Sequence, residues 1–214
     1  MNEAAICGDG DMFMIKNVIL DIGGVLIDWN PDKAFRKFGY SDETICKIKA
    51  AVLAPKVWVE EDLSIKSPEE LLVGFQRNRP ECAEEIRYFW EHFDMSVNQY
   101  PDSKDWIREI KECGKKVYIL SNFGRHCFDM LRNTKLDFMD MVDGGVISYE
   151  VHHVKPGREI YESLIEKYGL KTEESVFIDD REDNIVTAKM LGMNTILCRD
   201  REKTRQELWR KCDV

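Results

Sequence analysis

Reactive polar side chains stand where apolar runs end, in separate parts of this 214-residue chain. One run ends in Asp21, a second in Ser121 and a third in the pair Asp179-Asp180, while Lys155 lies in a loop. Carboxylates can attack an electrophilic centre or hold a hard cation, a hydroxyl donates a hydrogen bond, and a lysine supplies a compact positive charge. Each feature alone is typical of a turn or a solvated loop, so their meaning depends on whether the fold brings them together.

Strand-like and helix-like segments alternate around these residues. Apolar strand patterns precede Asp21 and occupy 116–120, 142–148, 175–178 and 194–198, and helical patterns occupy 104–113, 125–133, 159–168 and 183–191. This alternation predicts an α/β fold with a doubly wound parallel sheet. Because the carboxyl ends of parallel strands meet at one edge of a sheet, Asp21, Ser121 and Asp179-Asp180 are expected to gather there.

The segment 30–100 has a different character from the rest of the chain. It has little strand pattern and many charges, and it contains helical runs at 42–53, 68–77 and 82–93. We therefore predict a helical cap domain at 30–100, inserted after the first strand of an α/β core formed by 14–29 and 101–214. Residues 1–13 are polar and contain glycine, which predicts a flexible N-terminal tail.

The composition limits the classes of partner. The net charge of −9 argues against binding to nucleic acid or to an anionic membrane. Seven cysteines are scattered without a Cys-x-x-Cys pair, which is typical of reduced thiols in a cytoplasmic protein. No apolar run approaches the length that a membrane span requires. We expect a cytoplasmic protein, monomeric or weakly dimeric, with no nucleic-acid or membrane partner.

The ordered set of motifs resembles the haloacid dehalogenase superfamily of hydrolases. The resemblance extends from Met14 to about residue 200 and depends on Asp21-Ile22-Gly23-Gly24-Val25, Leu120-Ser121-Asn122, Lys155-Pro156 and Phe177-Ile178-Asp179-Asp180 with Asn184. Within the superfamily, the chain is most similar to bacterial phosphatases that act on glucose 1-phosphate and related sugar phosphates. This resemblance implies a helical cap that closes over the site, and a small phosphorylated metabolite as substrate.

The resemblance and the chemistry of phosphoryl transfer assign roles to the motif residues. Asp21 would attack phosphorus and form an aspartyl-phosphate, which water then hydrolyses. Lys155 and Ser121 would complete the catalytic set by contacting the nucleophile and the phosphate. Gly24 and Asn122 would contact the substrate, because a residue without Cβ lets the backbone approach the phosphate and an amide can donate to it.

A divalent cation is part of the implied site. Asp21, the backbone carbonyl of Gly23 and Asp180 offer the oxygen ligands that Mg²⁺ prefers. The cation would neutralise the repulsion between a carboxylate and a phosphate. Asp179 and Asn184 are expected to orient Lys155 and the water ligands of the metal.

Gly23 departs from the family pattern, because most phosphatases of this kind carry a second aspartate two positions after the nucleophile. Three hypotheses follow: a phosphatase whose leaving oxygen is good or takes a proton from solvent, a dehalogenase, and a catalytically weak relative that binds phosphate. Halide displacement needs neither an acid nor a divalent metal, and Asp179-Asp180 would repel the carboxylate of a haloacid. Charge therefore favours the phosphatase.

The cap segment contains further residues of interest. Trp58, Trp90 and Phe93 are interpreted as the core of a helical bundle and not as a platform for stacking sugars. Asp28, just before this segment, is interpreted as a helix cap, with a position facing the active site as the alternative. Leu63-Ser64-Ile65 stands where relatives often have Gly-x-Ile in a loop that faces the site, so the substrate preference of those relatives does not transfer.

Overall fold

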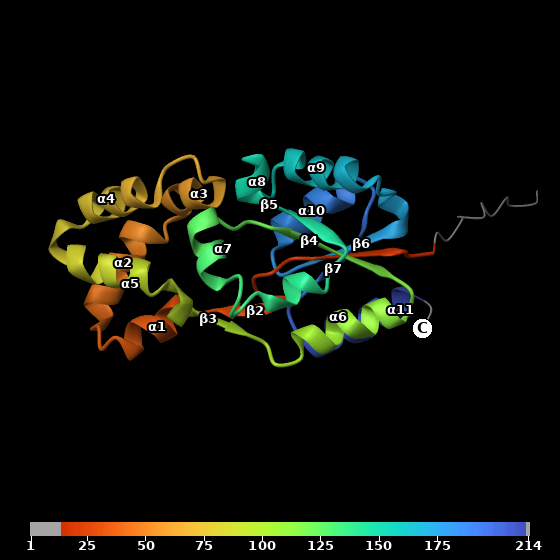
Figure 1. Ribbon diagram of the computed structural model, residues 1–214, viewed down its shortest axis with the longest axis horizontal. Coiled ribbons are helices and arrows are strands. Elements are labelled where there is room, and N and C mark those ends of the chain that lie inside the picture. The colour runs from red at the N-terminus through yellow and green to blue at the C-terminus, as the bar shows by residue number, and fades with distance from the viewer. Residues whose placement is uncertain (1–13, 213–214) are drawn as a thin grey trace, which may run out of the picture.

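A five-stranded parallel sheet forms the centre of the computed structural model, which describes residues 14–212 (Figure 1). The strand order is β5-β4-β1-β6-β7, from β1 (Asn17–Leu20), β4 (Lys116–Ser121), β5 (Gly144–Ile147), β6 (Ser175–Asp179) and β7 (Asn194–Leu197). This confirms the predicted α/β fold with its doubly wound parallel sheet. The N-terminal tail predicted at 1–13 lies outside the described residues.

Helices cover both faces of the sheet (Figure 1). One layer contains α6 (Ser103–Glu112) and α11 (Arg201–Lys211), and the other contains α8 (Ser148–Val151), α9 (Arg158–Tyr168) and α10 (Glu182–Met190). Successive strand residues point to opposite faces, so β1 contributes Val18 and Leu20 to one hydrophobic core and Ile19 to the other. Both faces of the strands are therefore apolar, as a covered parallel sheet requires.

The register of the three central strands aligns their carboxyl ends. Leu20 pairs with Ile119 of β4 and with Ile178 of β6. The residues that follow, Asp21 and Asp179, therefore reach the same level at the sheet edge, one on each of two neighbouring strands.

A short antiparallel ribbon connects the sheet to a separate group of helices. β2 (Ile27–Trp29) leads the chain away from the core and β3 (Val97–Gln99) brings it back beside β2. Between them lie α1 (Pro31–Lys37), α2 (Asp42–Val52), α3 (Pro55–Leu63), α4 (Pro68–Asn78), η1 (Pro80–Cys82), α5 (Ala83–Glu91) and η2 (Phe93–Ser96). These helices form a cap beside the core (Figure 1), and the domain division at 30–100 stays a prediction.

The remaining elements complete the core. They are α7 (Arg125–Leu131), η3 (Asp137–Asp140) and η4 (Thr172–Glu174). Among the described residues, no helix has the length and apolar character of a membrane span.

The ribbon corrects the interpretation of Asp28 as a helix cap. Asp28 lies inside β2, opposite Asn98 of β3. The first helix of the cap begins later, at Pro31, and its N-cap is Asn30, whose side-chain oxygen accepts a hydrogen bond from the backbone of Lys33 at 3.0 Å. Three consecutive residues were too few to predict β2 from their alternation.

Candidate active site

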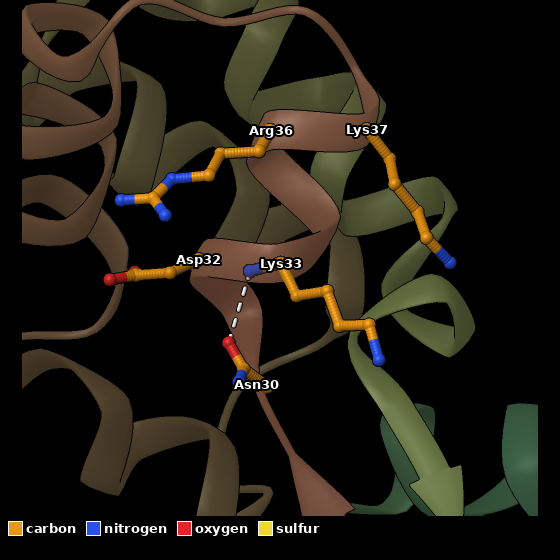
Figure 2. A pocket seen from close by; sticks show the side chains of 5 residues that line it. All are labelled: Asn30, Asp32, Lys33, Arg36 and Lys37. Atoms are coloured by element: carbon orange, nitrogen blue, oxygen red, sulfur yellow. Dashed lines mark hydrogen bonds between the residues drawn. The ribbon is translucent and has the colours of Figure 1, made fainter.

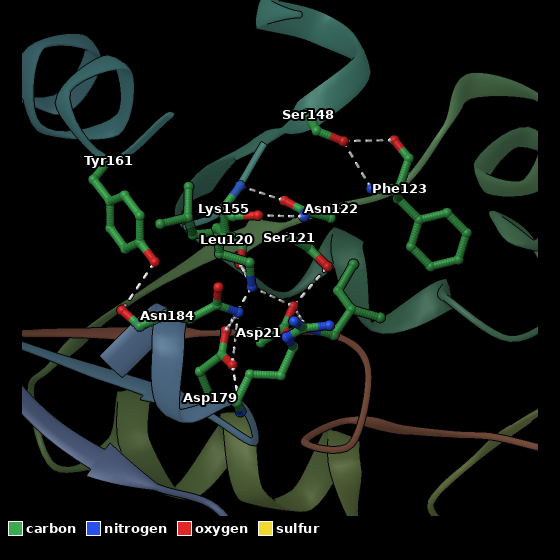
Figure 3. A network of polar contacts seen from close by, with 12 residues as sticks. Asp21, Leu120, Ser121, Asn122, Phe123, Ser148, Lys155, Tyr161, Asp179 and Asn184 are labelled. Carbon is green, nitrogen blue, oxygen red and sulfur yellow. Dashed lines mark hydrogen bonds and ion pairs between the residues drawn. The ribbon is translucent and has the colours of Figure 1, made fainter. Parts of the chain in front are cut away.

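Asp21 is held at the sheet edge by three hydrogen-bond donors on one carboxylate oxygen (Figure 3). Its Oδ1 accepts from Ser121 Oγ at 2.7 Å, from the backbone N–H of Ile22 at 2.7 Å, and lies 2.9 Å from Lys155 Nζ. Within residues 14–212, no hydrogen bond reaches Oδ2. The contacts fix the orientation of the carboxylate and leave one oxygen available for a reaction.

Lys155 is a buried cation between two carboxylates. Its Nζ lies 2.6 Å from Asp179 Oδ2 and donates to the carbonyl of Leu120 at 2.9 Å, and the residue is 4% exposed. Burial disfavours the ammonium, but the charges of Asp21 and Asp179 outweigh burial and raise the Lys155 pKa. Burial also raises the pKa of Asp21 to about 7, against the effect of Lys155.

The loop that carries Lys155 is fixed by Asn122. The Asn122 amide donates to the Lys155 carbonyl at 3.0 Å, and its oxygen accepts from the Lys155 backbone N–H at 2.8 Å. Both polar atoms of the Asn122 side chain are thereby engaged. The sequence predicted a substrate contact for this residue, and its geometry shows how it positions the lysine.

Asp179 is saturated by hydrogen bonds. Besides Lys155, its oxygens accept from the backbone of Arg181 at 2.8 Å and from the Asn184 amide at 2.9 and 3.0 Å. The amide oxygen of Asn184 is buried, and no described residue hydrogen-bonds to it. A buried acceptor without a donor suits the hydrogen of a water bound to a cation.

The donor set fits a hard divalent cation. Asp21, Asp179 and Asp180 each offer a carboxylate oxygen, and these oxygens lie within 4.8 Å of one another. Because Asp179 is already saturated, Asp21 and Asp180 are the members able to ligate. Gly24 makes room for this arrangement, since its φ is +68° and a Cβ there would lie 2.5 Å from Asp180 Oδ2. Gly23, beside them, lines the same cavity.

A cavity of about 490 Å³ opens over this cluster and reaches into the cap. Its walls combine the core residues above, together with Phe123 and Arg181 of the core, with residues from the ribbon and the cap: Ile27, Asp28, Trp29, Trp58, Glu61, Asp62 and Phe93. Most of the residues on the cap side could not be predicted from the sequence, because they belong to no motif and come from elements that lie far apart in the chain.

The aromatic residues of the cap divide between two places. Trp58 stacks on Trp29 with ring centroids 5.5 Å apart and on Phe93 at 5.8 Å, and all three line the cavity. Trp90 is buried and stacks on His126. The interpretation as bundle core is therefore wrong for Trp58, which forms a cavity wall, and correct for Trp90. Phe93 is both buried and part of the wall.

Glu61 fastens the cap to the core. Its carboxyl is 1% exposed and accepts from the backbone N–H of Gly124 at 3.0 Å and of Cys127 at 3.5 Å, just after β4. Burial raises the Glu61 pKa to about 7. A Cβ on Gly124 would lie 2.1 Å from the carboxyl, so only glycine allows this contact.

The acidic residues at the end of α3 are a sequence signal that could have identified Glu61 and Asp62 as functional residues. Glu60, Glu61 and Asp62 stand in the last turn of the helix, which has no basic residue. Acidic side chains there oppose the helix dipole. Residues that break a local rule are expected at functional positions.

The loop after α3 contacts the core beside the cavity. Ser64 adopts a left-handed conformation with φ of 48°, and its hydroxyl accepts from the backbone of Arg125 at 2.8 Å. Ser64 and Ile65 line a different hollow, which they share with Arg125. The tripeptide Leu63-Ser64-Ile65 thus docks the cap, and the cavity wall is formed by the residues just before it.

Another hollow lies on α1 of the cap, away from the cluster (Figure 2). It is lined by Asn30, Asp32, Lys33, Arg36 and Lys37. The side chains of Arg36 and Lys37 point apart, and Asp32 pairs with Lys49 of α2. Exposed side chains on one helix do not converge on a ligand, so this hollow is not a second active site.

Comparisons with known proteins identify the family of the chain. A family model for haloacid dehalogenase-like hydrolases matches residues 15–192. A D-ribitol-5-phosphate phosphatase of Bacteroides thetaiotaomicron is 29% identical over 91% of this chain and 97% of its own. A sesquiterpene phosphatase of Aspergillus oryzae is 25% identical over 90% of this chain and 94% of its own.

Solved structures share the fold. A HAD-family enzyme from Bacteroides thetaiotaomicron, in complex with magnesium and inorganic phosphate, superposes with a TM-score of 0.67 at 24% identity, covering 86% of this chain and 93% of that one. An L-2-haloacid dehalogenase from Xanthobacter autotrophicus gives a TM-score of 0.63 at 18% identity, covering 85% of this chain and 76% of that one.

Proposed function

Because this chain belongs to the haloacid dehalogenase-like hydrolase family, we propose that it is a Mg²⁺-dependent phosphatase that hydrolyses small phosphomonoesters through an aspartyl-phosphate on Asp21. The observation that carries the proposal is the Asp21 carboxylate, held on one oxygen by Ser121 and Lys155 and placed beside Asp180. The phosphatase names of two relatives that match the chain almost end to end support it.

The residues of the cluster can perform both halves of the reaction. The free oxygen of Asp21 attacks phosphorus, and the bond to the leaving oxygen breaks. Lys155 and Ser121 stabilise the charge of the transferring phosphoryl group. Lys155 is already held in place by Asp179 and the Leu120 carbonyl, and Ser121 by its hydrogen bond to Asp21. Water then attacks the aspartyl-phosphate and releases inorganic phosphate.

The cation would be held by Asp21, the Gly23 carbonyl and Asp180. When bound, Mg²⁺ supplies the positive charge that lets a carboxylate approach a phosphate dianion. Asp179 and Asn184 act beside it: Asp179 fixes Lys155, and the unpaired oxygen of Asn184 can accept from a metal-bound water.

Sugar phosphates are the substrate class that we propose. The D-ribitol-5-phosphate phosphatase among the relatives supports a polyol or sugar phosphate. The aromatic side chains of Trp29 and Trp58, which line the cavity, suit the apolar face of a sugar ring. A cytoplasmic location and a monomeric or weakly dimeric state stay predictions.

The dehalogenase hypothesis fits the cluster less well. A haloacid carries its own carboxylate, which would enter a cavity already lined by Asp21 and Asp180. A phosphate that binds through a cation instead needs those carboxylates, because they are the ligands of the cation. The likeness to haloacid dehalogenase structures is a likeness of fold.

A panel of phosphate esters with and without Mg²⁺ tests the proposal. We expect phosphate release from sugar phosphates and from p-nitrophenyl phosphate, and loss of release in EDTA. Halide release from 2-haloacids that persists in EDTA would instead establish the dehalogenase. Phosphate binding by calorimetry without turnover of either class would establish the catalytically weak relative.

A further inference from the structure

The missing aspartate at Gly23 raises the question of which group protonates the leaving oxygen. Gly23 has no side chain, and a Cβ built there would meet nothing within 4 Å. The space that a second aspartate would occupy is thus open to a group from elsewhere. The cavity is lined by five carboxyl residues: Asp21, Asp28, Glu61, Asp62 and Asp180.

Three of these carboxyls already have other roles. Asp21 is the proposed nucleophile and Asp180 a proposed ligand of the cation. Glu61 accepts from the backbone N–H groups of Gly124 and Cys127, so its oxygens are engaged in fastening the cap. Asp28 and Asp62 remain.

Asp28 lies in β2, and its charge acts on Tyr100, which is not among the residues that line the cavity. Burial and the Asp28 carboxylate together raise the pKa of Tyr100, which follows β3 at the base of the ribbon. Asp62, by contrast, interacts electrostatically with Asp21 and Lys155 at the reacting centre.

The position of Asp62 is fixed by contacts between α3 and the start of α8. Its carbonyl accepts from Ser148 Oγ at 2.6 Å, and the carbonyl of the next residue, Leu63, is 2.7 Å from His152 Nδ1. Among residues 14–212, no hydrogen bond reaches the carboxyl of Asp62. Its backbone is therefore anchored on the core while its side chain stays free to meet a substrate.

The surroundings of Asp62 favour its protonated form. Burial is the main cause and the Glu61 carboxyl beside it the next, and together they raise the Asp62 pKa well above its ordinary value. Asp21 acts in the same direction, and the cations Lys155 and Arg181 oppose it. A carboxyl whose pKa is raised holds its proton more readily than an ordinary aspartate, which suits general acid catalysis.

We propose that Asp62, supplied by the cap, is the general acid and base of this site in place of the residue missing at Gly23. The inference rests on the proposed phosphatase function. In the first step Asp21 forms a bond to phosphorus, the P–O bond of the ester breaks, and the Asp62 proton passes to the leaving oxygen. In the second step the oxygen of water forms a bond to phosphorus, the bond between phosphorus and the Asp21 oxygen breaks, and the water gives a proton to the Asp62 carboxylate. This restores both residues and releases phosphate.

The dependence on the leaving group tests this role. Single-turnover rates, with enzyme in excess and Mg²⁺ present, are compared for p-nitrophenyl phosphate and phenyl phosphate. Nitrophenolate leaves readily as an anion, whereas the more basic phenolate needs a proton. We expect Asp62→Asn to slow the phenyl ester by about 10²- to 10³-fold and the nitrophenyl ester by about tenfold or less.

Two variants serve as controls in the same assay. Glu60→Gln removes a carboxylate from the same helix turn, but Glu60 pairs with Lys66 and does not line the cavity, so both rates should stay within about twofold of wild type. Asp28→Asn removes the competing carboxyl and should not change the ratio of the two rates. Circular dichroism and melting curves establish that each variant is folded.

The outcomes separate this inference from the proposed function. Wild-type enzyme that releases neither phenol contradicts phosphatase function, and the inference with it. Wild-type turnover with an equal loss for both esters in Asp62→Asn, or with no loss, overturns the role of Asp62 alone. A selective loss in Asp28→Asn would assign the proton to Asp28.

Discussion

The two sides of the cavity are built in different ways. On the core side, Asp21, Lys155 and Asp179 are buried ions that come from strand ends and from a loop fixed by Asn122. On the cap side, Trp58 and Asp62 extend from α3, which packs against α7 and α8 and whose hydrogen bonds to the core lie around residues 61–64. The core side is preorganised by the fold, and the cap side depends on the position of the cap relative to the core.

This difference assigns separate tasks to the two sides. A saturated ionic cluster does not rearrange when charge develops, which suits stabilisation of a transferring phosphoryl group. A wall that belongs to the cap can move away to admit a substrate and return. We therefore expect changes on the core side to abolish chemistry or unfold the protein, and changes on the cap side to alter proton transfer, pH dependence and substrate preference.

Asp21→Asn should have the largest effect. The substitution preserves shape and removes the nucleophile, so turnover of p-nitrophenyl phosphate should fall by about 10⁵-fold or more. The fold should survive, because Lys155 keeps Asp179 as its partner. Steady-state rates and a melting curve check both expectations. A residual activity within about 100-fold of wild type would mean that another residue attacks phosphorus.

Lys155→Met should cause the largest loss of stability. It leaves Asp21 and Asp179 buried without their common cation, and removing one partner of a buried ion pair costs about 3–5 kcal/mol. Urea denaturation at pH 7 measures the free energy of unfolding. Adding Asp179→Asn to this variant should restore part of the loss, since it removes one unpaired charge. A single-variant loss below about 1 kcal/mol would show that the cluster is not a tight network.

The core side could be predicted from the sequence for a physical reason. Each strand is an apolar run, and the polar residue that ends it must lie at the sheet edge, so Asp21, Ser121 and Asp179 could be placed together without coordinates. The fold class followed from the same alternation. The roles of these residues stay predictions until they are tested.

The cap side resisted prediction because its residues share no pattern. Trp29, in a three-residue strand, and Trp58, in a helix of low amphipathic contrast, meet only after the ribbon and the cap are folded. Which apolar side chain faces a cavity and which faces a bundle core depends on tertiary packing, as Trp58 and Trp90 demonstrate. Short elements such as α8 and the ribbon strands also lie below the length at which periodicity is informative.

Glu61 should give the cap side a pH-dependent stability. In the fold it keeps its proton up to about pH 7, whereas in the unfolded chain it ionises near its ordinary value of 4.5. Between these values unfolding releases a proton, so stability is highest at low pH and falls as the pH rises, by at most about 3 kcal/mol. The free energy of unfolding of wild type and Glu61→Gln, measured from pH 4.5 to 7.5, should show a steeper fall for wild type. Parallel slopes would contradict a protonated Glu61.

Trp58→Ala should have the smallest effect on activity, and this effect should be limited to substrates that carry a ring. An aromatic contact contributes about 0.5–1.5 kcal/mol, so KM for a phosphate ester that carries a ring should rise by about threefold to tenfold while kcat changes little. A small ester such as methyl phosphate should be hydrolysed as before, because it does not reach the wall formed with Trp29 and Phe93.

Trp90→Phe is the control for this prediction. Trp90 is buried against His126, outside the cavity, so its replacement should lower the melting temperature without changing either KM. Equal changes in KM for both esters in Trp58→Ala would mean that the cap side positions the phosphate as well, and the division of tasks between the two sides would fail.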